Sequence, residues 1–186
     1  RQLEREEGRV LDGLRLVAAL DNIIGLGEAL TNAKALDAAS GPDVILATNT
    51  SALSVGSIAE ACARPERVIG LHFFNPAPVM ALVEIVAAER TAGAVIDRAV
   101  GAMTAWGKTP VRCMDSPGFI VNRVNRPFTL EALRMLEAGD ASVEAIDAAL
   151  RAAGFPLGPF ELIDLAGLDV NLAATHGIWE GLGRPE

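Results

Sequence analysis

Short apolar runs rich in β-branched residues alternate with helical patterns in the first part of this 186-residue chain. The runs are VILAT at 44–48, RVIGLHF at 67–73, ALVEIV at 81–86 and TPVRC at 109–113. Between them, SVGSIAEACA and TAGAVIDRAVGAMTAWG carry apolar residues at helical spacing. Buried strands that alternate with helices predict a layered α/β domain with a largely parallel sheet. In such sheets, ligands bind at the carboxyl ends of the strands.

Other signals in this part concern where helices begin and end. Ser54 stands where a serine N-cap is expected, and Gly107 follows a helical pattern at a typical C-terminal stop. Residues 1–20 place apolar residues between charges at helical spacing, so we expect a helix there. Residues 21–41 show no clear pattern.

The remainder of the chain has a different sequence pattern, which is typical of helices. FIVNRVNRPFTLEALRMLEA at 119–138 predicts one helix, which Pro127 should kink or split. Ser142 should cap a further helix through Ala152, and GPFELIDLAGLDVNLAATHGIWEGLG supplies more helix. We therefore expect a partial α/β domain at 1–114 and an all-helical domain at 115–186, with a ligand cleft at the boundary.

Composition excludes several classes of protein. The net charge of −8 argues against a nucleic-acid surface, which needs clustered Lys and Arg. No apolar run approaches the roughly 18 residues of a membrane span, and RQLEREEGRV is too charged for a signal peptide. Cys62 and Cys113 form no C-x-x-C pair, so we expect a reducing, cytoplasmic setting, and we expect no metal site.

Two polar residues interrupt the apolar strands 67–73 and 81–86. A charge such as Glu84 inside a buried strand is costly unless it has a partner. His72 lies 12 residues earlier, and Glu84 reaches it if the two strands lie side by side. Taken alone, a histidine that follows a strand is more often structural than catalytic. A neutral imidazole, whose ordinary pKa is about 6.5, is instead suited to accept a proton at neutral pH.

Five segments, in order along the chain, carry a more specific signal. They are TNTSALS, RPERVIGLHFFNPAPVMALVEIV, GKTPV, DSPGFIVNRV and GPFELIDLAGLDV. Together they resemble the NAD-dependent L-3-hydroxyacyl-CoA dehydrogenases, over about residues 43–181. Within that family, NPAPVMALVEIV and GPFELIDLAGLDVN are most similar to bacterial forms that act on 3-hydroxyadipyl-CoA or 3-hydroxybutyryl-CoA.

The resemblance implies a fold, a cofactor and partners. The fold is a partial Rossmann-type NAD-binding domain followed by an all-α dimerisation domain. The cofactor is NAD, the substrate is an acyl-CoA, and the helical domain forms a homodimer. The activity interconverts L-3-hydroxyacyl-CoA and 3-oxoacyl-CoA, in fatty-acid or phenylacetate-type aromatic degradation.

The resemblance also implies roles for individual residues. His72 corresponds to the catalytic base and Glu84 to its carboxylate partner. Ser51 corresponds to the serine that binds the substrate's 3-oxygen near the nicotinamide, and Asn122 to the asparagine that holds the substrate. Asn49 either contacts the nicotinamide ribose or closes a turn. Each also has a structural alternative, since Ser51 suits a turn and Asn122 a helix cap.

Some other residues are expected to be structural. Phe73, Phe74 and Met80 are interpreted as core residues rather than as the wall of a ligand site. His176 has no evident partner in the sequence, so we expect a structural role for it as well.

The chain departs from the family in its first part. The family opens with a strand, a G-x-G-x-x-G turn and an acidic residue for the adenosine ribose. IIGLGEAL at 23–30 has Leu30 where the third glycine belongs, and we interpret it as a turn or helix end. Glu28 and Lys34 have the wrong spacing for the family's cofactor contacts. We therefore expect a fragment of a longer enzyme; the alternative is a non-catalytic acyl-CoA-binding or dimerisation module.

Overall fold

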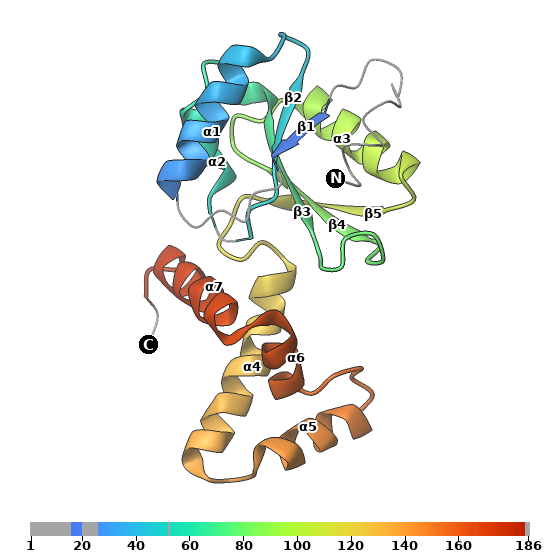
Figure 1. Cartoon of the computed structure of the whole chain (residues 1–186), viewed down its shortest axis with the longest axis vertical. Coiled ribbons are helices and arrows are strands. Elements are labelled where there is room, and N and C mark those ends of the chain that lie inside the picture. Colours follow the sequence, from blue (N-terminus) through green and yellow to red (C-terminus); the bar gives the residue numbers. More distant parts are fainter. Residues whose placement is uncertain (1–15, 20–25, 52, 185–186) are drawn as a thin grey trace. The chain divides into compact units, whose positions relative to one another are not determined.

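The computed structural model describes residues 16–19, 26–51 and 53–184 (Figure 1). The chain divides into two compact units, Arg1–Phe119 and Ile120–Glu186. The first unit contains a sheet covered by helices, and the second consists of helices. This is the predicted fold class, a Rossmann-like α/β domain followed by a helical domain.

The first unit is built on a five-stranded sheet in the order β1-β2-β3-β4-β5. The first three strands are parallel to one another, β3 and β4 are antiparallel, and β5 is parallel to β4. The sheet is therefore mixed, although most of its pairings are parallel as expected. The strands are β1 (Leu16–Ala19), β2 (Ile45–Thr48), β3 (Val68–Phe73), β4 (Leu82–Ala87) and β5 (Thr109–Met114).

Helices cover both faces of this sheet. In Figure 1, α1 (Leu26–Ala39) and α2 (Val55–Glu60) lie on one side, and α3 (Gly93–Ala105) lies on the other. Because alternate side chains of a strand point to opposite faces, β2, β3 and β4 each contribute to two apolar clusters. On the α3 side the buried residues are Ile45, Ala47, Ile69, Leu71, Val83, Ile85, Val95, Ala99, Ala102 and Met103. On the α2 side they are Val44, Leu46, Val55, Ala59, Cys62, Val68, Val86, Ala88 and Phe119.

Gly70 allows α2 to pack closely on the sheet. A Cβ atom at this position would lie 2.7 Å from Cβ of Val86 and 2.9 Å from Cγ2 of Val55. No side chain fits in that space, so the helix that follows the 49–54 segment lies directly against β3.

The first part of the chain corrects one prediction. Leu16–Ala19 forms strand β1, which pairs with β2, so the expected helix at 1–20 is wrong there. Residues 1–15 of that prediction lie outside the described residues. A short apolar run cannot be assigned to helix or strand by periodicity alone, and here the pairing with β2 decides. Gly27 lies inside α1, and Gly25 falls outside the described residues.

The expected helix boundaries are confirmed where capping side chains were identified. The Ser54 hydroxyl accepts a hydrogen bond from the Ser57 N–H at 3.1 Å, and α2 begins at the next residue. Ser142 accepts a hydrogen bond from the Ala145 N–H in the same way. Gly107 follows α3 with a φ of +74°, a conformation that favours glycine at the end of a helix.

The second unit consists of α4 (Val121–Ala138), α5 (Val143–Ala152), α6 (Pro159–Ala166) and α7 (Leu168–Gly181). The central helix is α6, which packs against the other three. Helix α4 runs through Pro127 without a break, so the proline does not split it. The buried Asp147 carboxylate accepts hydrogen bonds from the N–H groups of Phe160 and Glu161 and caps α6. In the described ranges, no helix combines the length and apolar character that crossing a membrane requires.

Candidate active site

His72 and Glu84 face each other across the antiparallel pair β3–β4. They are direct partners in the strand register, which places both side chains on the same face of the sheet. The His72 Nδ1 atom lies 2.6 Å from the Glu84 Oε2 atom. The two side chains are only 5% and 1% exposed. The sheet thus holds a carboxylate and an imidazole in contact away from water.

Ser51 lies on the other side of the imidazole. Its Oγ is 3.0 Å from the His72 Nε2 atom, in the segment that follows β2. A carboxylate only accepts hydrogen bonds, so the Nδ1–H group donates to Glu84. The Nε2 atom then carries the lone pair and accepts a hydrogen bond from the Ser51 hydroxyl. With this tautomer, the Nε2 atom faces a hydroxyl group on the side of the ring opposite Glu84.

Two aromatic rings flank the imidazole. The ring centroids of Phe74 and Phe119 lie 4.7 Å and 5.5 Å from that of His72, both in edge-to-face arrangements. Phe73 packs against the core as expected. Met80 is 40% exposed, so its expected place in the core is wrong; it lies in the β3–β4 connection, outside both apolar clusters. Phe119 was not identified from the sequence, although it belongs to the DSPGF segment.

Asn49 contacts the backbone next to His72. Its Oδ1 accepts a hydrogen bond from the Phe73 N–H at 2.8 Å. In the segment that follows, the Thr50 hydroxyl accepts a hydrogen bond from the Leu53 N–H at 2.8 Å. The contact of Asn49 favours the turn-closing role over the ribose contact, and cofactor binding by this residue stays a prediction.

Asn122 belongs to the helical unit. It is the second residue of α4, which has Ile120 as its N-cap residue, and its side chain is half-buried. Asn122 is therefore not the cap of this helix. Its contact with a substrate stays a prediction.

Sequence reasoning missed the role of Asp115, which follows β5. Its carboxylate accepts hydrogen bonds from the Ser54 hydroxyl at 2.8 Å and from the N–H groups of Val55 and Gly56 at 3.1 and 2.7 Å. Asp115 therefore fixes the start of α2, the helix that follows the 49–54 segment containing Ser51.

Lys108 was missed in the same way, and it holds the connection between β3 and β4. Its Nζ donates to the backbone carbonyls of Ala77 and Met80 at 2.5 and 2.9 Å. The only signal in the sequence was the GKTPV segment, which carries no information about these distant partners.

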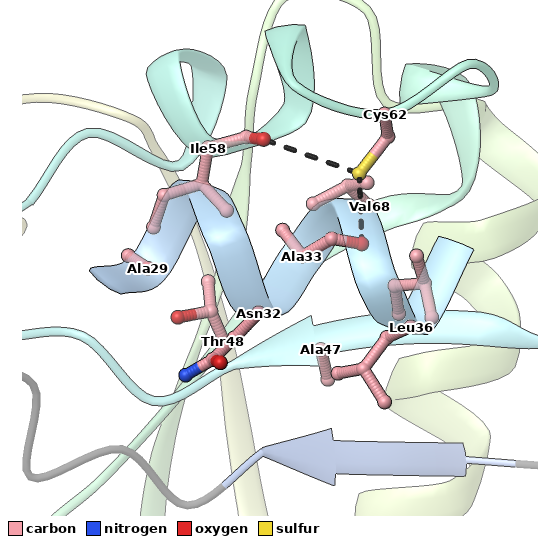
Figure 2. Close-up of a pocket in the computed structure, with 10 residues that line it drawn as sticks. Ala29, Asn32, Ala33, Leu36, Ala47, Thr48, Ile58, Cys62 and Val68 are labelled. Carbon is pink, nitrogen blue, oxygen red and sulfur yellow. Dashed lines mark hydrogen bonds between the residues drawn. The ribbon is translucent and has the colours of Figure 1, made fainter. Parts of the chain in front are cut away.

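A small cavity lies between α1, α2 and the sheet (Figure 2). Its volume is about 20 Å³, close to what one water molecule requires. None of the predicted site residues lines it. Thr48 does line it, and no partner reaches the buried Thr48 hydroxyl within the described residues. Nor do the described residues contain three or more His, Cys, Asp or Glu side chains placed to hold a metal ion.

Comparison with known families matches both units. The model of the 3-hydroxyacyl-CoA dehydrogenase NAD-binding domain matches residues 31–116. The model of the C-terminal domain of the same enzymes matches residues 118–186. The two models therefore match most of the chain, in the order in which the two units follow each other.

Individual relatives support the same relationship. The chain is 55% identical to 3-hydroxyadipyl-CoA dehydrogenase of Escherichia coli over 139 residues, which are 74% of this chain and 29% of the relative. It is 50% identical to the human mitochondrial hydroxyacyl-coenzyme A dehydrogenase over 145 residues, 77% of this chain and 46% of the relative. The chain thus spans less than half the length of these two curated relatives.

Solved structures resemble the chain over nearly its whole length. The crystal structure of 3-hydroxybutyryl-CoA dehydrogenase from Escherichia coli superposes with a TM-score of 0.86 at 47% identity, covering 94% of this chain and 36% of that one. The crystal structure of FadB2 from M. tuberculosis gives a TM-score of 0.88 at 39% identity, covering 92% and 61%.

Proposed function

The chain belongs to the 3-hydroxyacyl-CoA dehydrogenase family, and on that premise we propose that it interconverts L-3-hydroxyacyl-CoA and 3-oxoacyl-CoA. The observation that carries this proposal is His72, held between Glu84 and Ser51. We propose His72 as the general base and Glu84 as its partner. Ser51 and Asn122 are proposed to bind the substrate.

The geometry suits the removal of a proton from a secondary alcohol. The Nε2 lone pair accepts the hydroxyl proton while hydride leaves the adjacent carbon. The imidazole becomes a cation, which Glu84 stabilises through the Nδ1–H bond. The Ser51 hydroxyl, 3.0 Å from Nε2, donates to the developing oxyanion. In the reverse direction the imidazolium returns the proton to the 3-oxygen.

NAD, when bound, supplies the hydride acceptor for this reaction. The residues near β2 fit its nicotinamide end, because Ser51 follows a strand at the carboxyl edge of three parallel strands. The sequence contains no complete G-x-G-x-x-G turn for the pyrophosphate. We therefore assign Ser51 to the cofactor's reactive end only.

We also propose the division into domains and the partners. The family matches change at residues 116–118, which supports a boundary near Asp115. The relatives are named for CoA thioesters, which supports an acyl-CoA substrate. Fatty-acid or aromatic degradation stays a prediction for the pathway. Self-association through the helical unit is supported by its exposed apolar side chains. The cytoplasmic setting stays a prediction.

The test uses the natural full-length polypeptide that contains these residues. NADH absorbance is followed with acetoacetyl-CoA as the substrate. We expect His72→Gln to lower kcat by about 10²–10⁴-fold without loss of folding. Glu84→Gln should lower it by about 10²-fold or more, because the imidazole loses its orienting carboxylate.

His176→Gln is the matched control, since His176 is exposed and its ring meets the Trp179 ring edge to face. It should leave kcat unchanged. Full activity in His72→Gln would exclude this residue as the base. A full-length protein inert to NADH would favour the non-catalytic acyl-CoA-binding module.

A further inference from the structure

We propose that Asn49 is a positioning residue, which sets the distance between the Ser51 hydroxyl and the His72 imidazole. This inference rests on the proposed function, because it gives Asn49 a task in that same site. It differs from the sequence-based prediction, in which Asn49 contacts the cofactor.

The first argument is the end of the β2–β3 ladder. The pairing of β2 with β3 ends at Thr48 and Gly70, although β3 continues to Phe73. Beyond Thr48 the chain leaves the sheet, so backbone pairing between the two strands stops. There the Asn49 Oδ1 accepts the Phe73 N–H at 2.8 Å. The side chain thus extends the cross-link between the two strands past the end of the ladder.

The second argument is how close this link lies to the catalytic pair. Asn49 and Ser51 are two residues apart on one segment, and Phe73 directly follows His72 on the other. The same two segments are therefore joined twice, by Asn49 to the Phe73 N–H and by Ser51 to His72 Nε2. A shift of the first link moves the second, because only one residue separates Asn49 from Ser51.

The third argument is that the far end of the segment is held independently. The Thr50 hydroxyl accepts the Leu53 N–H, and the Asp115 carboxylate accepts from Ser54, Val55 and Gly56. The helix start therefore stays in place when Asn49 is changed. The Asn49 contact therefore sets the position of the segment only at its end nearest His72. A substitution at Asn49 should thus change the position of Ser51 without unfolding the domain.

The geometry requires an acceptor and no donor at position 49. The Phe73 N–H is a donor, so the atom that it meets is the amide oxygen. Asn49→Asp keeps an oxygen of the same reach, whereas Asn49→Leu keeps only the shape. A residue that contacts the ribose through its amide N–H would not be rescued by aspartate.

The experiment compares these two variants in the natural full-length protein, with acetoacetyl-CoA and NADH. We expect Asn49→Leu to lower kcat by about 10–100-fold, as a displaced catalytic group does, with the KM for NADH nearly unchanged. Asn49→Asp should restore kcat to within several-fold. Asn171→Leu is the control, since the side-chain amide of Asn171 donates to the Gly167 carbonyl within its own helix turn.

The contrary result is a raised KM for NADH in both variants with kcat unchanged, which would make Asn49 a cofactor ligand. If Asn49→Leu does not fold, Asn49→Asp decides alone, because the two roles predict opposite effects on its KM. Amide hydrogen exchange at Phe73 tests the link without activity. Faster exchange in Asn49→Leu but not in Asn49→Asp is expected, and equal exchange in all three proteins overturns the proposal. If the unmodified protein is inert, the proposed function fails while this readout still decides the link.

Discussion

At the scale of single residues, the two cysteines differ from reactive thiols. Burial, together with the negative charges of Glu84 and Asp115, raises the pKa of Cys113 to about 12. Burial and the charge of Asp37 also raise the pKa of Cys62. Since the thiolate is the nucleophile, both groups are unreactive near neutral pH. We expect no alkylation by iodoacetamide at about pH 8 in the folded protein. Mass spectrometry checks this, with the unfolded protein as the control; rapid modification of the folded protein would contradict it.

A second prediction at this scale concerns the Thr48 hydroxyl beside the cavity in Figure 2. An unpaired buried hydroxyl lowers stability by about 1–3 kcal/mol, and valine has nearly the same shape. Thr48→Val should therefore raise the free energy of unfolding, measured in urea. Thr91→Val is the matched contrast, since its hydroxyl bonds both the Val68 carbonyl and the Ala88 N–H. It should lower stability by about 1–2 kcal/mol. A loss of stability in Thr48→Val would indicate a water bound to the hydroxyl.

At the scale of secondary-structure elements, a buried ion pair connects α1 to the start of β3. The Arg67 guanidinium contacts the Asp37 carboxylate and the carbonyls of Gly41 and Val44. Burial by itself raises the pKa of Asp37, but the hydrogen bonds from Arg67 and the Ala63 N–H outweigh it and lower the pKa below 3.8. The pair thus stabilises the ionised form of Asp37 in the folded state.

This shift predicts how stability depends on pH. Because the folded-state pKa is depressed, the contribution of Asp37 is complete above the unfolded value of about 3.9 and is lost as pH falls through the folded value. At neutral pH, Asp37→Asn should lower the free energy of unfolding by about 3–5 kcal/mol, and this difference should shrink below about pH 4. Denaturant titrations at several pH values measure it. Asp97→Asn, which breaks an exposed pair with Arg112, should have little effect at any pH. A difference that stays constant with pH would contradict this assignment.

The elements also show how far the sequence determines the fold. The runs at 44–48, 67–73 and 81–86 were identifiable because strands buried on both faces are continuously apolar. The run at 109–113 forms the edge strand β5, which is only partly buried. Strand β1 was not identifiable, because its four residues form a strand by pairing with β2, nearly 30 residues later in the chain. The direction of β4 was deducible: only residues 74–81 connect it to β3, too few for the crossover that a parallel pair needs.

The candidate site was also predictable from the sequence only in part. The pairing of His72 with Glu84 was predictable, because a lone acid in an apolar strand requires a partner and the next strand supplied one. The contacts of Asp115 with residues about 60 positions earlier were not, since no local pattern encodes them. What the sequence leaves open is thus which distant elements support the site, and this depends on tertiary packing.

At the scale of the whole molecule, the helical unit leaves large apolar side chains exposed. In α7, Leu168 and Leu172 are 69% and 58% exposed, and Leu165 of α6 is 75% exposed. Leu168 and Leu172 are four residues apart, so they share one face of the helix. Exposed apolar patches of this kind mark surfaces that associate with a partner, and a second copy of the chain is the proposed one.

The prediction is that the natural full-length protein is a dimer whose interface includes this face of α7. Replacing Leu168 and Leu172 together by Glu places two charges in the interface of each copy, and burying unpaired charges costs several kcal/mol. Sedimentation velocity over a range of concentrations should show a dimer for the parent and a monomer for the double variant. Val79→Glu changes an equally exposed apolar residue, 76% exposed in the first unit, and should leave the dimer intact. A parent that stays monomeric at the highest concentration would contradict self-association. A double variant that stays dimeric would place the interface elsewhere on the molecule.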